Sequence, residues 1–335
     1  MANVVTKTVA PDEADMRLDR WFKDHYPGLS FGHLQKLLRS GQVRIDGARA
    51  KTNDRVRPGQ AIRIPPLGVD EAGGSPHVAR PSGAKGSVAD ALMEMCLFQD
   101  AHLFVFNKPW GLAVQGGSGL STHVDGMLES LRDAKGQKPR LVHRLDRETS
   151  GVLVVARTRL AASRLAESFR ARTTRKIYWA LVKDVPRPAQ GRVSTWLARD
   201  GGPAGEKMKV ARHGEADASH AVSLYSMVDN AGQNLAWLTM RPVTGRTHQL
   251  RAHAAHIGHP IIGDSKYFEA DSNWSFPGGM QNKLHLHARR IVIPHPSGGG
   301  VVDVTAPLPP HMLQTWNLLG FDTELGGERE PDEDA

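Results

Sequence analysis

The sequence predicts an α+β fold, in which a mixed, mainly antiparallel sheet with flanking helices follows a small basic α+β domain. Short apolar runs bounded by turn residues, such as 103–106 and 152–155, are typical of buried strands. Between such runs, Ala161, Leu165 and Phe169 recur at helical spacing. A segment rich in Gly, Pro, Ala and Ser separates this larger part from the basic one.

The length of 335 residues is enough for two domains and a sizeable core. We expect a first domain at 1–65, a flexible linker at 66–88, a second domain at 89–321 and a disordered acidic tail at 322–335. No apolar run approaches the ~20 residues that a membrane helix needs. The single cysteine excludes an intrachain disulfide and fits a reducing cytoplasm, which is the location we expect.

The first domain is predicted to hold two helices and several short strands. Leu18, Trp21 and Phe22 form the apolar side of the first helix, and Ser30 is a candidate N-cap for the second. The alternating segment 42–45 is followed by Asp46-Gly47, which is typical of a hairpin turn, and 61–64 alternates again.

Positive charge is concentrated in this first domain. The net charge is +8, and between Arg17 and Arg63 there are eleven Lys or Arg against four Asp. Such a balance indicates a polyanionic partner, nucleic acid rather than a membrane. A solvated charged face is the alternative. The candidate contacts to a phosphate backbone are Arg17, Arg20, Lys36, Arg39 and Arg44.

The stretch 141–151, Leu-Val-His-Arg-Leu-Asp-Arg-Glu-Thr-Ser-Gly, carries the first chemical motif. It precedes the buried-strand candidate 152–155, so its polar side chains would be presented at the mouth of a core strand. If the segment is extended, Arg144 and Asp146 face the same way. An adjacent guanidinium would keep the carboxylate ionised and nucleophilic, although a surface ion pair in a loop would show the same spacing.

The order His143-Arg144-Leu145-Asp146, followed by Thr149-Ser150-Gly151, resembles the signature of the RluA-type pseudouridine synthases. The resemblance implies that Asp146 is the catalytic residue. In the first domain, the segments "SGQVRIDG" and "VRPGQAIRI" resemble the S4 RNA-binding domain, whose helices lay a basic face against folded RNA. "GLSFGHLQKLLRSGQVRIDGARAK" looks most like the RluC-type members, which implies large-subunit ribosomal RNA as the substrate.

Two further motifs continue the resemblance. Lys176 and Tyr178 share one face of a strand predicted at 176–182, and in the family the Tyr stacks on the target base; on the residues alone, a core Tyr is the alternative. "TGRTHQLRAH", 244–253, resembles the element whose Arg pairs with the catalytic Asp, which implies Arg251 as that partner. Thr247 is expected to cap the helix that carries Arg251. The remaining candidates for RNA contact are His143, Arg144, Lys176, Arg246 and His248.

Several segments carry weaker signals. The segment 186–220 is expected to form a hairpin with a long loop from Arg199 to Glu215 that contacts RNA. The glycines at 116–119 do not open a G-x-G-x-x-G helix, so a turn is preferred to a nucleotide cofactor site. The histidines at 248–259, with His285 and His287, lack the acids or Cys that would complete a metal site, so no metal is expected.

These observations predict an enzyme that isomerises uridine to pseudouridine in RNA, with neither cofactor nor metal, and acting as a monomer. A carboxylate nucleophile that forms a transient bond divides this reaction into two easier steps. The alternatives are a non-catalytic RNA-binding or ribosome-assembly factor, a synthase that acts on tRNA, and a carboxylate-dependent nucleoside hydrolase. The hydrolase would want a second acid, for which only Glu148 is near.

Overall fold

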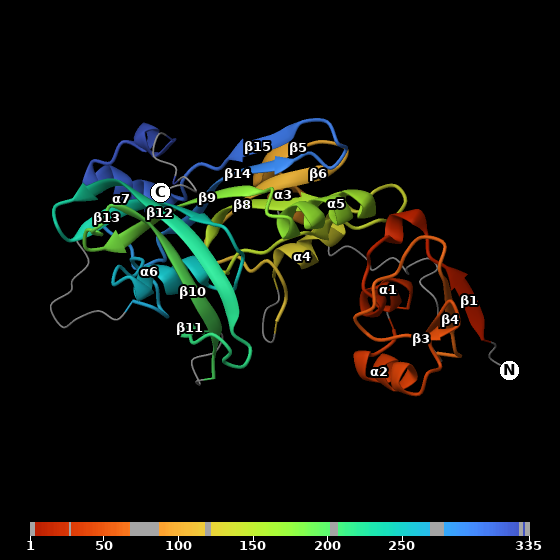
Figure 1. Cartoon of the computed structure of the whole chain (residues 1–335). Coiled ribbons are helices and arrows are strands. Elements are labelled where there is room, and N and C mark those ends of the chain that lie inside the picture. Colours follow the sequence, from red (N-terminus) through yellow and green to blue (C-terminus); the bar gives the residue numbers. More distant parts are fainter. Residues whose placement is uncertain are drawn as a thin grey trace. The chain divides into compact units, whose positions relative to one another are not determined.

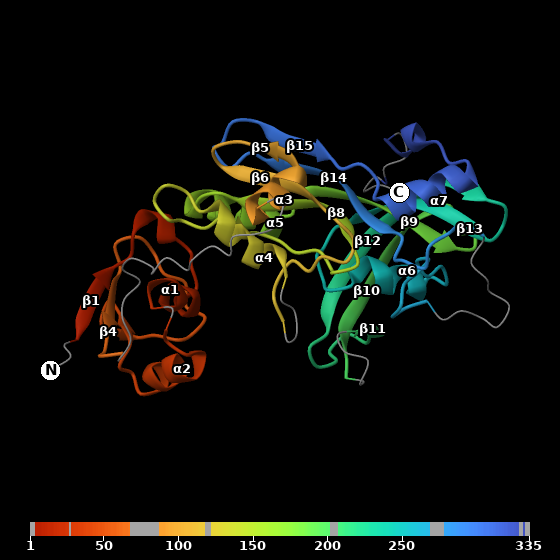
Figure 2. The same ribbon diagram turned by 180° about the vertical axis from the view of Figure 1, so that it is seen from behind.

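The computed structural model describes residues 4–26, 28–67, 87–117, 122–201, 207–268, 278–327 and 331. The chain divides into two compact units, 1–85 with 158–164, and 86–157 with 165–335, and each is described by itself (Figures 1 and 2). Most of the predicted linker and half of the predicted acidic tail lie outside the described residues. Within the tail, the structure describes one 3-10 helix, η3 (Thr323–Gly327). Among the described residues, no helix is both long and apolar enough to cross a membrane.

The first unit is a four-stranded antiparallel sheet with two helices and a 3-10 turn. Its strands follow the order β1-β4-β2-β3. The bounds of its elements are β1 Val5–Thr8, η1 Pro11–Glu13, α1 Leu18–His25, α2 Phe31–Arg39, β2 Arg44–Ile45, β3 Ala48–Arg49 and β4 Ala61–Ile64. The hydroxyl of Ser30 accepts a hydrogen bond from the backbone N–H of His33, so the predicted cap of α2 is confirmed.

The core of this unit is built from the apolar sides of both helices. Leu18 and Trp21 of α1 pack with Leu34 and Leu38 of α2, against Ile62 of β4. Burial of these side chains fixes the helices on the sheet, at a stabilisation of roughly 1.5–3 kcal/mol for each large apolar side chain. The charged side chains of the same helices therefore remain on the outer surface.

The second unit is organised around an eleven-stranded sheet. Its strands are β5 Cys96–Gln99, β6 Leu103–Lys108, β7 Arg140–Leu141, β8 Ser150–Ala156, β9 Arg175–Lys183, β10 Gln190–Asp200, β11 Lys207–Ala211, β12 Ser219–Ala231, β13 Leu235–Pro242, β14 Leu286–Pro294 and β15 Val301–Thr305. Their order is β11-β10-β12-β13-β9-β14-β8-β6-β5, with β15 paired to β14 and β7 to β8. The β14–β8 pair is parallel and the other pairs are antiparallel, so the predicted mixed, mainly antiparallel sheet is confirmed.

The helices that follow α1 and α2 in the chain are α3 Val88–Glu94, α4 Val124–Met127, η2 Leu128–Leu131, α5 Arg159–Arg170, α6 Gln249–His256 and α7 Pro310–Leu319. Of these, α6 and α7 cover opposite faces of the central strands (Figure 1). Along β9, Ala180 packs with Leu250 of α6, whereas Trp179 packs with Trp316 of α7. This alternation follows from the two-residue period of a strand, and it confirms that Lys176 and Tyr178 share one face, which is the face towards α6.

The segment 186–220 differs from its prediction. The long loop expected from Arg199 to Glu215 contains the strand β11, whose residues Lys207–Ala211 pair with Trp196–Asp200 of β10. The expected hairpin is therefore a three-stranded extension of the sheet, β11-β10-β12, and only 202–206 lies outside the described residues. The sequence did not indicate this strand, because both faces of β11 are partly exposed and its residues therefore form no continuous apolar run.

Candidate active site

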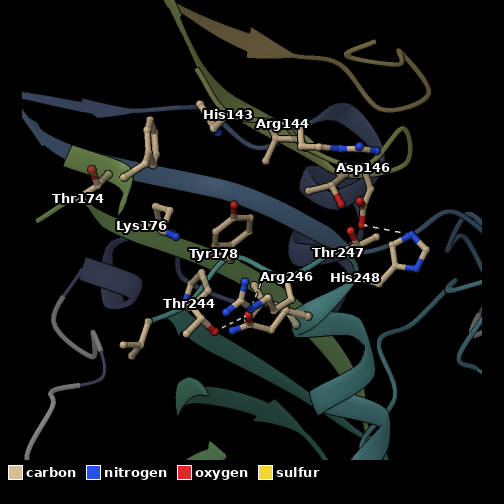
Figure 3. Close-up of a pocket in the computed structure, with 18 of the residues that line it drawn as sticks. His143, Arg144, Asp146, Thr174, Lys176, Tyr178, Thr244, Arg246, Thr247 and His248 are labelled. Atoms are coloured by element: carbon tan, nitrogen blue, oxygen red, sulfur yellow. Dashed lines mark hydrogen bonds and ion pairs between the residues drawn. The ribbon is translucent and has the colours of Figure 1, made fainter. Parts of the chain in front are cut away.

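A cavity of about 670 Å³ opens on the α6 face of the sheet. Figure 3 shows residues of the loop 142–149 along one side, residues of the turn 244–248 along the other, and Lys176 and Tyr178 between them. The end of α5 adds Ala166, Phe169 and Arg170 to the lining. The two sequence motifs, about a hundred residues apart, therefore meet at one site. Of the predicted site residues, those that line the cavity are His143, Arg144, Asp146, Lys176, Tyr178, Arg246, His248 and Arg251.

Asp146 lies in the loop before β8. The loop turns directly after Asp146, where the Thr149 N–H donates to the carbonyl of Asp146 at 3.1 Å. The Asp146 side chain is 20% exposed. Its Oδ2 lies 3.6 Å from Nη1 of Arg251 and 3.8 Å from Nε2 of His248. Among the described residues, the guanidinium that pairs with this carboxylate is thus Arg251, whereas Arg144 is exposed at the rim.

Gly151 lets this loop approach the neighbouring strand. Its φ is +107°, and a Cβ there would overlap the backbone carbonyl oxygen of Ala288 in β14. The same residues are partners in the short parallel pairing of β8 with β14. Glycine is required at this position because only glycine combines such a φ with such a close backbone. The Asp146 loop is therefore anchored to the centre of the sheet.

Arg251 is a buried guanidinium held by three carboxylates. It is 2% exposed, and it donates to both oxygens of the fully buried Asp264 at 2.7 and 2.6 Å. Nη2 also reaches Glu148 at 3.2 Å. Hydrogen bonds and charges of these carboxylates raise the pKa of Arg251 despite its burial, so the cation is permanent. The sequence reasoning did not identify Asp264, which lies eleven residues after the motif 244–253.

Two polar side chains of β9 enter the cavity. Burial, together with the charge of Asp146, raises the pKa of Tyr178 well above its usual range, so the phenol remains protonated. Burial lowers the pKa of Lys176 to about 8. The floor of the cavity is therefore a neutral aromatic ring next to an amine that is still mainly protonated at neutral pH.

His143 supports the loop from behind. Its Nε2 accepts the backbone N–H of Val154 at 2.8 Å, and its ring stacks on Phe169 with centroids 4.8 Å apart. Burial and the charge of Lys176 lower the pKa of His143 to about 3, so the ring is neutral. With Nε2 occupied by the backbone, Nδ1–H is the donor that is left for a substrate.

The turn before α6 is held by Gln249 and not by the predicted cap Thr247. Oε1 of Gln249 accepts from the Arg246 N–H at 3.0 Å and from the Thr244 hydroxyl at 2.6 Å. The residue at the N-cap position is His248, with a left-handed φ of 50° and no side-chain cap bond. The prediction of a Thr247 cap was wrong because a side chain inside the helix satisfies these groups. Arg246 is fixed separately, its Nε donating to the His220 carbonyl at 3.1 Å.

Lys108 is a second buried cation near this site that the sequence reasoning left without a role. It is 1% exposed, and its ammonium donates to the carbonyls of Pro109, Leu112 and Arg147 at 3.0, 2.8 and 3.2 Å. Burial lowers its pKa to about 7, an effect that the charge of Asp146 opposes. Its three donors tie the loop after β6 to the loop that carries Asp146.

The predicted RNA contacts of the first unit are all exposed: Arg17, Arg20, Lys36, Arg39 and Arg44. Arg17 forms an ion pair with Asp19 at 2.8 Å. The Arg44 guanidinium donates to the carbonyls of Gly41 and Gly47.

The histidines that suggested a metal site are occupied by other partners. His253 lies between the hydroxyls of Ser223 and Thr195 at 2.9 and 3.0 Å, and His287 bonds Ser150 at 2.9 Å. Nε2 of His285 contacts the Thr315 hydroxyl at 2.9 Å. Across the described part of the chain, no group of three His, Cys, Asp or Glu is placed to hold a metal ion.

Comparison with known proteins finds relatives of both units of the chain. Residues 102–256 match the family model of the RNA pseudouridylate synthases, and 16–62 match the S4 domain. "Ribosomal large subunit pseudouridine synthase C" of Yersinia pestis is 34% identical over 304 residues, covering 90% of this chain and 91% of the relative. The protein of that name from Escherichia coli K12 is 34% identical, with 90% and 92% covered. The solved structure "Human RNA Pseudouridylate Synthase Domain Containing 4" is similar with a TM-score of 0.60 and 29% identity, over 70% of this chain and 97% of that one.

Proposed function

The chain belongs to the RNA pseudouridylate synthase family, and within that activity we propose that it modifies uridines of large-subunit ribosomal RNA with Asp146 as the reacting carboxylate. The observation that carries the proposal is the arrangement of three groups in one cavity. The Asp146 carboxylate is held beside the permanent cation of Arg251, and the neutral ring of Tyr178 lines the same space. The names of the relatives support the choice of substrate.

The reaction sets the chemical demands on this cavity. One N-glycosidic bond breaks, the uracil rotates, and a C–C bond forms, with no net gain or loss of atoms or electrons. A carboxylate nucleophile that makes and then releases one covalent bond is sufficient. Three routes share this carboxylate: attack on C1′ of the sugar, attack on C6 of the base, and removal of a sugar proton. The Arg251 cation serves each of them, because it keeps Asp146 ionised before the reaction.

The target uridine must leave its stack to reach Asp146, which costs a few kcal/mol. Tyr178 would repay part of this cost by stacking on the flipped uracil, since its phenol stays protonated and presents an uncharged ring. Arg144, exposed at the rim, would fill the gap that the base leaves. Lys176, Arg246 and the neutral His143 would contact the sugar and phosphates around it.

The basic side chains of the first unit would add affinity and orientation. Phosphate contacts of this kind are independent of sequence, so we assign them to the fold of the RNA and not to the choice of the uridine. We also propose that the protein acts as a monomer in the cytoplasm.

The test is pseudouridine mapping of ribosomal and transfer RNA from cells that lack this gene, complemented with the wild type, Asp146→Asn or Glu129→Gln. Glu129 is an exposed carboxylate in ion pairs with Arg132 and Lys138, so its variant makes the same charge change away from the cavity. We expect sites in large-subunit ribosomal RNA to vanish and to return with the wild type and Glu129→Gln only.

Each other outcome overturns a stated part. Restoration by Asp146→Asn would remove Asp146 as the reacting group and favour a non-catalytic binding role. Loss of sites in transfer RNA alone would replace ribosomal RNA as the substrate.

A further inference from the structure

Tyr267 connects the strand β11 with the active site through one hydroxyl. Its Oη accepts the backbone N–H of Met208 at 2.7 Å. The same Oη lies 3.2 Å from Nδ1 of His248. The other nitrogen of that imidazole, Nε2, lies 3.8 Å from Oδ2 of Asp146 (Figure 3). The Tyr267 hydroxyl and the His248 ring therefore link the backbone of β11, at Met208, to the carboxylate of Asp146.

The direction of each bond follows from the donors that the groups carry. A backbone N–H can only donate, so the Tyr267 oxygen is the acceptor in its bond with Met208. The hydroxyl keeps one hydrogen to donate, and if it donates this hydrogen to Nδ1 of His248, that nitrogen offers a lone pair. A neutral imidazole with a lone pair on Nδ1 carries its proton on Nε2.

We propose that Tyr267 and His248 are positioning residues, which fix His248 as the neutral Nε2–H tautomer and aim this N–H at Oδ2 of Asp146. The inference rests on the proposed role of Asp146. Both the Arg251 and the His248 contacts go to Oδ2, so this oxygen is held and Oδ1 is the oxygen that reacts. The 3.8 Å separation closes to a hydrogen bond when RNA fills the cavity, since catalytic hydrogen bonds commonly tighten in the complex.

A neutral donor suits this place better than a second cation. Arg251 already supplies a permanent positive charge, and an imidazolium would add another beside the nucleophile and weaken it. Burial lowers the pKa of His248, and Arg251 and Lys266 act in the same direction against the charges of Asp146 and Asp264. The ring is therefore neutral at pH 7, as the directed chain requires.

The backbone of His248 explains why its side chain reaches Asp146. Its φ of 50° and ψ of 20° lie in the left-handed region, which non-glycine residues seldom occupy. Such a conformation persists where the surroundings fix it, and residues that adopt it cluster at functional sites. Two opposite predictions follow from it. A merely structural role would favour Asn, which tolerates this conformation well, whereas a donor role requires a nitrogen at the place of Nε2.

The first test is the tautomer itself, read from the ¹⁵N shifts of the histidine rings in the full-length protein at pH 7 without RNA. The His248 signals are assigned by their absence in His248→Gln. We expect the Nε2–H tautomer; an Nδ1–H tautomer or an imidazolium would overturn the inference. This readout needs no substrate, so it stands or falls independently of the proposed function.

The second test compares two amides in pseudouridine formation. His248→Gln places an amide N–H near the position of Nε2, and His248→Asn does not. We expect His248→Asn to be about 10- to 100-fold slower than His248→Gln, the value of a hydrogen bond to a charged group. Equal rates, or a faster Asn variant, would contradict the proposal. Tyr267→Phe is expected to lower kcat while Tyr225→Phe does not, because the Tyr225 hydroxyl donates to the Pro188 carbonyl and not to His248.

Discussion

Arg251 donates two hydrogen bonds to Asp264, from Nε to Oδ2 at 2.7 Å and from Nη2 to Oδ1 at 2.6 Å. Asp264 is fully buried and also accepts the backbone N–H groups of Lys266 and Tyr267. The fork geometry fixes the plane of the guanidinium, and Nη1 is left 3.6 Å from Asp146. The cation beside the proposed nucleophile is thus oriented by a different carboxylate.

The first prediction concerns this second carboxylate. Asp264→Asn would leave a buried guanidinium without its bidentate partner, so we expect a loss of roughly 3–5 kcal/mol in the free energy of unfolding. We also expect lower activity, because Arg251 would turn towards Asp146, and a tighter ion pair would make that carboxylate a weaker nucleophile. Urea denaturation and turnover at a temperature where both proteins are folded measure the two effects.

Asp303→Asn is the matched control. Asp303 makes the same two-bond contact with Arg290, but both side chains are more than a third exposed. Solvent screens this pair, so the expected loss is less than about 1 kcal/mol. Equal losses in the two variants would show that the buried pair contributes nothing special to stability.

Much of the site follows from the sequence because it is carried by contiguous motifs. The order of residues around Asp146 and Arg251 identified both, and the two-residue period of β9 placed Lys176 and Tyr178 on one face. Strand parity is a local property, so it can be read without knowing the neighbours. The cap of α2 at Ser30 was predicted for the same reason.

Interactions between distant segments were not predictable in this way. The partner of Arg251, Asp264, lies thirteen residues further along the chain, in the loop after α6. The contact between Tyr267 and Met208 depends on β11, whose sequence has no continuous apolar face. Arg144 was considered as the cation beside Asp146, but the guanidinium that lies there is that of Arg251, from a helix about a hundred residues later in the chain. In each case tertiary packing decided the contact, and spacing along the chain carried no information about it.

The second prediction tests the anchor of the Asp146 loop. Gly151→Ala would force a Cβ into the Ala288 carbonyl in addition to an unfavourable φ, so we expect β8 and β14 to separate locally and activity to fall steeply. Gly136→Ala is the control: Gly136 has a φ of +73° and no atom within 4 Å of the added Cβ. It carries the cost of the backbone conformation alone, about 1–2 kcal/mol. Thermal melting and turnover of both variants are compared; equal effects would mean that the close approach is unimportant.

The third prediction is a pH dependence of RNA binding. Burial lowers the pKa of Lys176 to about 8, so its positive charge is present below pH 8 and is lost as the pH rises through 8 to 9. If Lys176 contacts a phosphate, the RNA dissociation constant rises over this window, where an ordinary lysine would still be charged. Titrations from pH 7 to 9.5 measure it. Lys176→Gln should bind more weakly at pH 7 and show a flatter profile; identical profiles would exclude the contact.

The fourth prediction concerns the basic surface of the first unit. Lys36 and Arg39 are exposed on α2, and each phosphate contact contributes about one to the slope of log affinity against log salt. Lys36→Gln with Arg39→Gln should therefore weaken RNA binding and reduce this slope by roughly two. Arg55→Gln in the same unit is the control, since Arg55 is already paired with Asp15. If the salt slope of the double variant equals that of the wild type, these residues do not contact RNA.

The last prediction concerns stability in acid. His253 is fully buried between two hydroxyls, and burial, with the charge of His256, lowers its pKa to about 4. The unfolded chain binds a proton there below about pH 6.5, whereas the folded chain does not until about pH 4. The neutral ring thus contributes stability that is complete above pH 6.5 and is lost as the pH falls towards 4, at up to about 1.4 kcal/mol per pH unit.

His253→Gln removes this titration together with the hydrogen bonds of the imidazole. We expect it to be less stable than the wild type at pH 7.5, with a difference that narrows as the pH falls from 6.5 to 4.5. Free energies of unfolding from urea curves at several pH values measure this difference. His33→Gln, at an exposed position on α2, should run parallel to the wild type. A constant difference for His253→Gln would mean that the buried ring takes up its proton as readily in the folded chain as in the unfolded one.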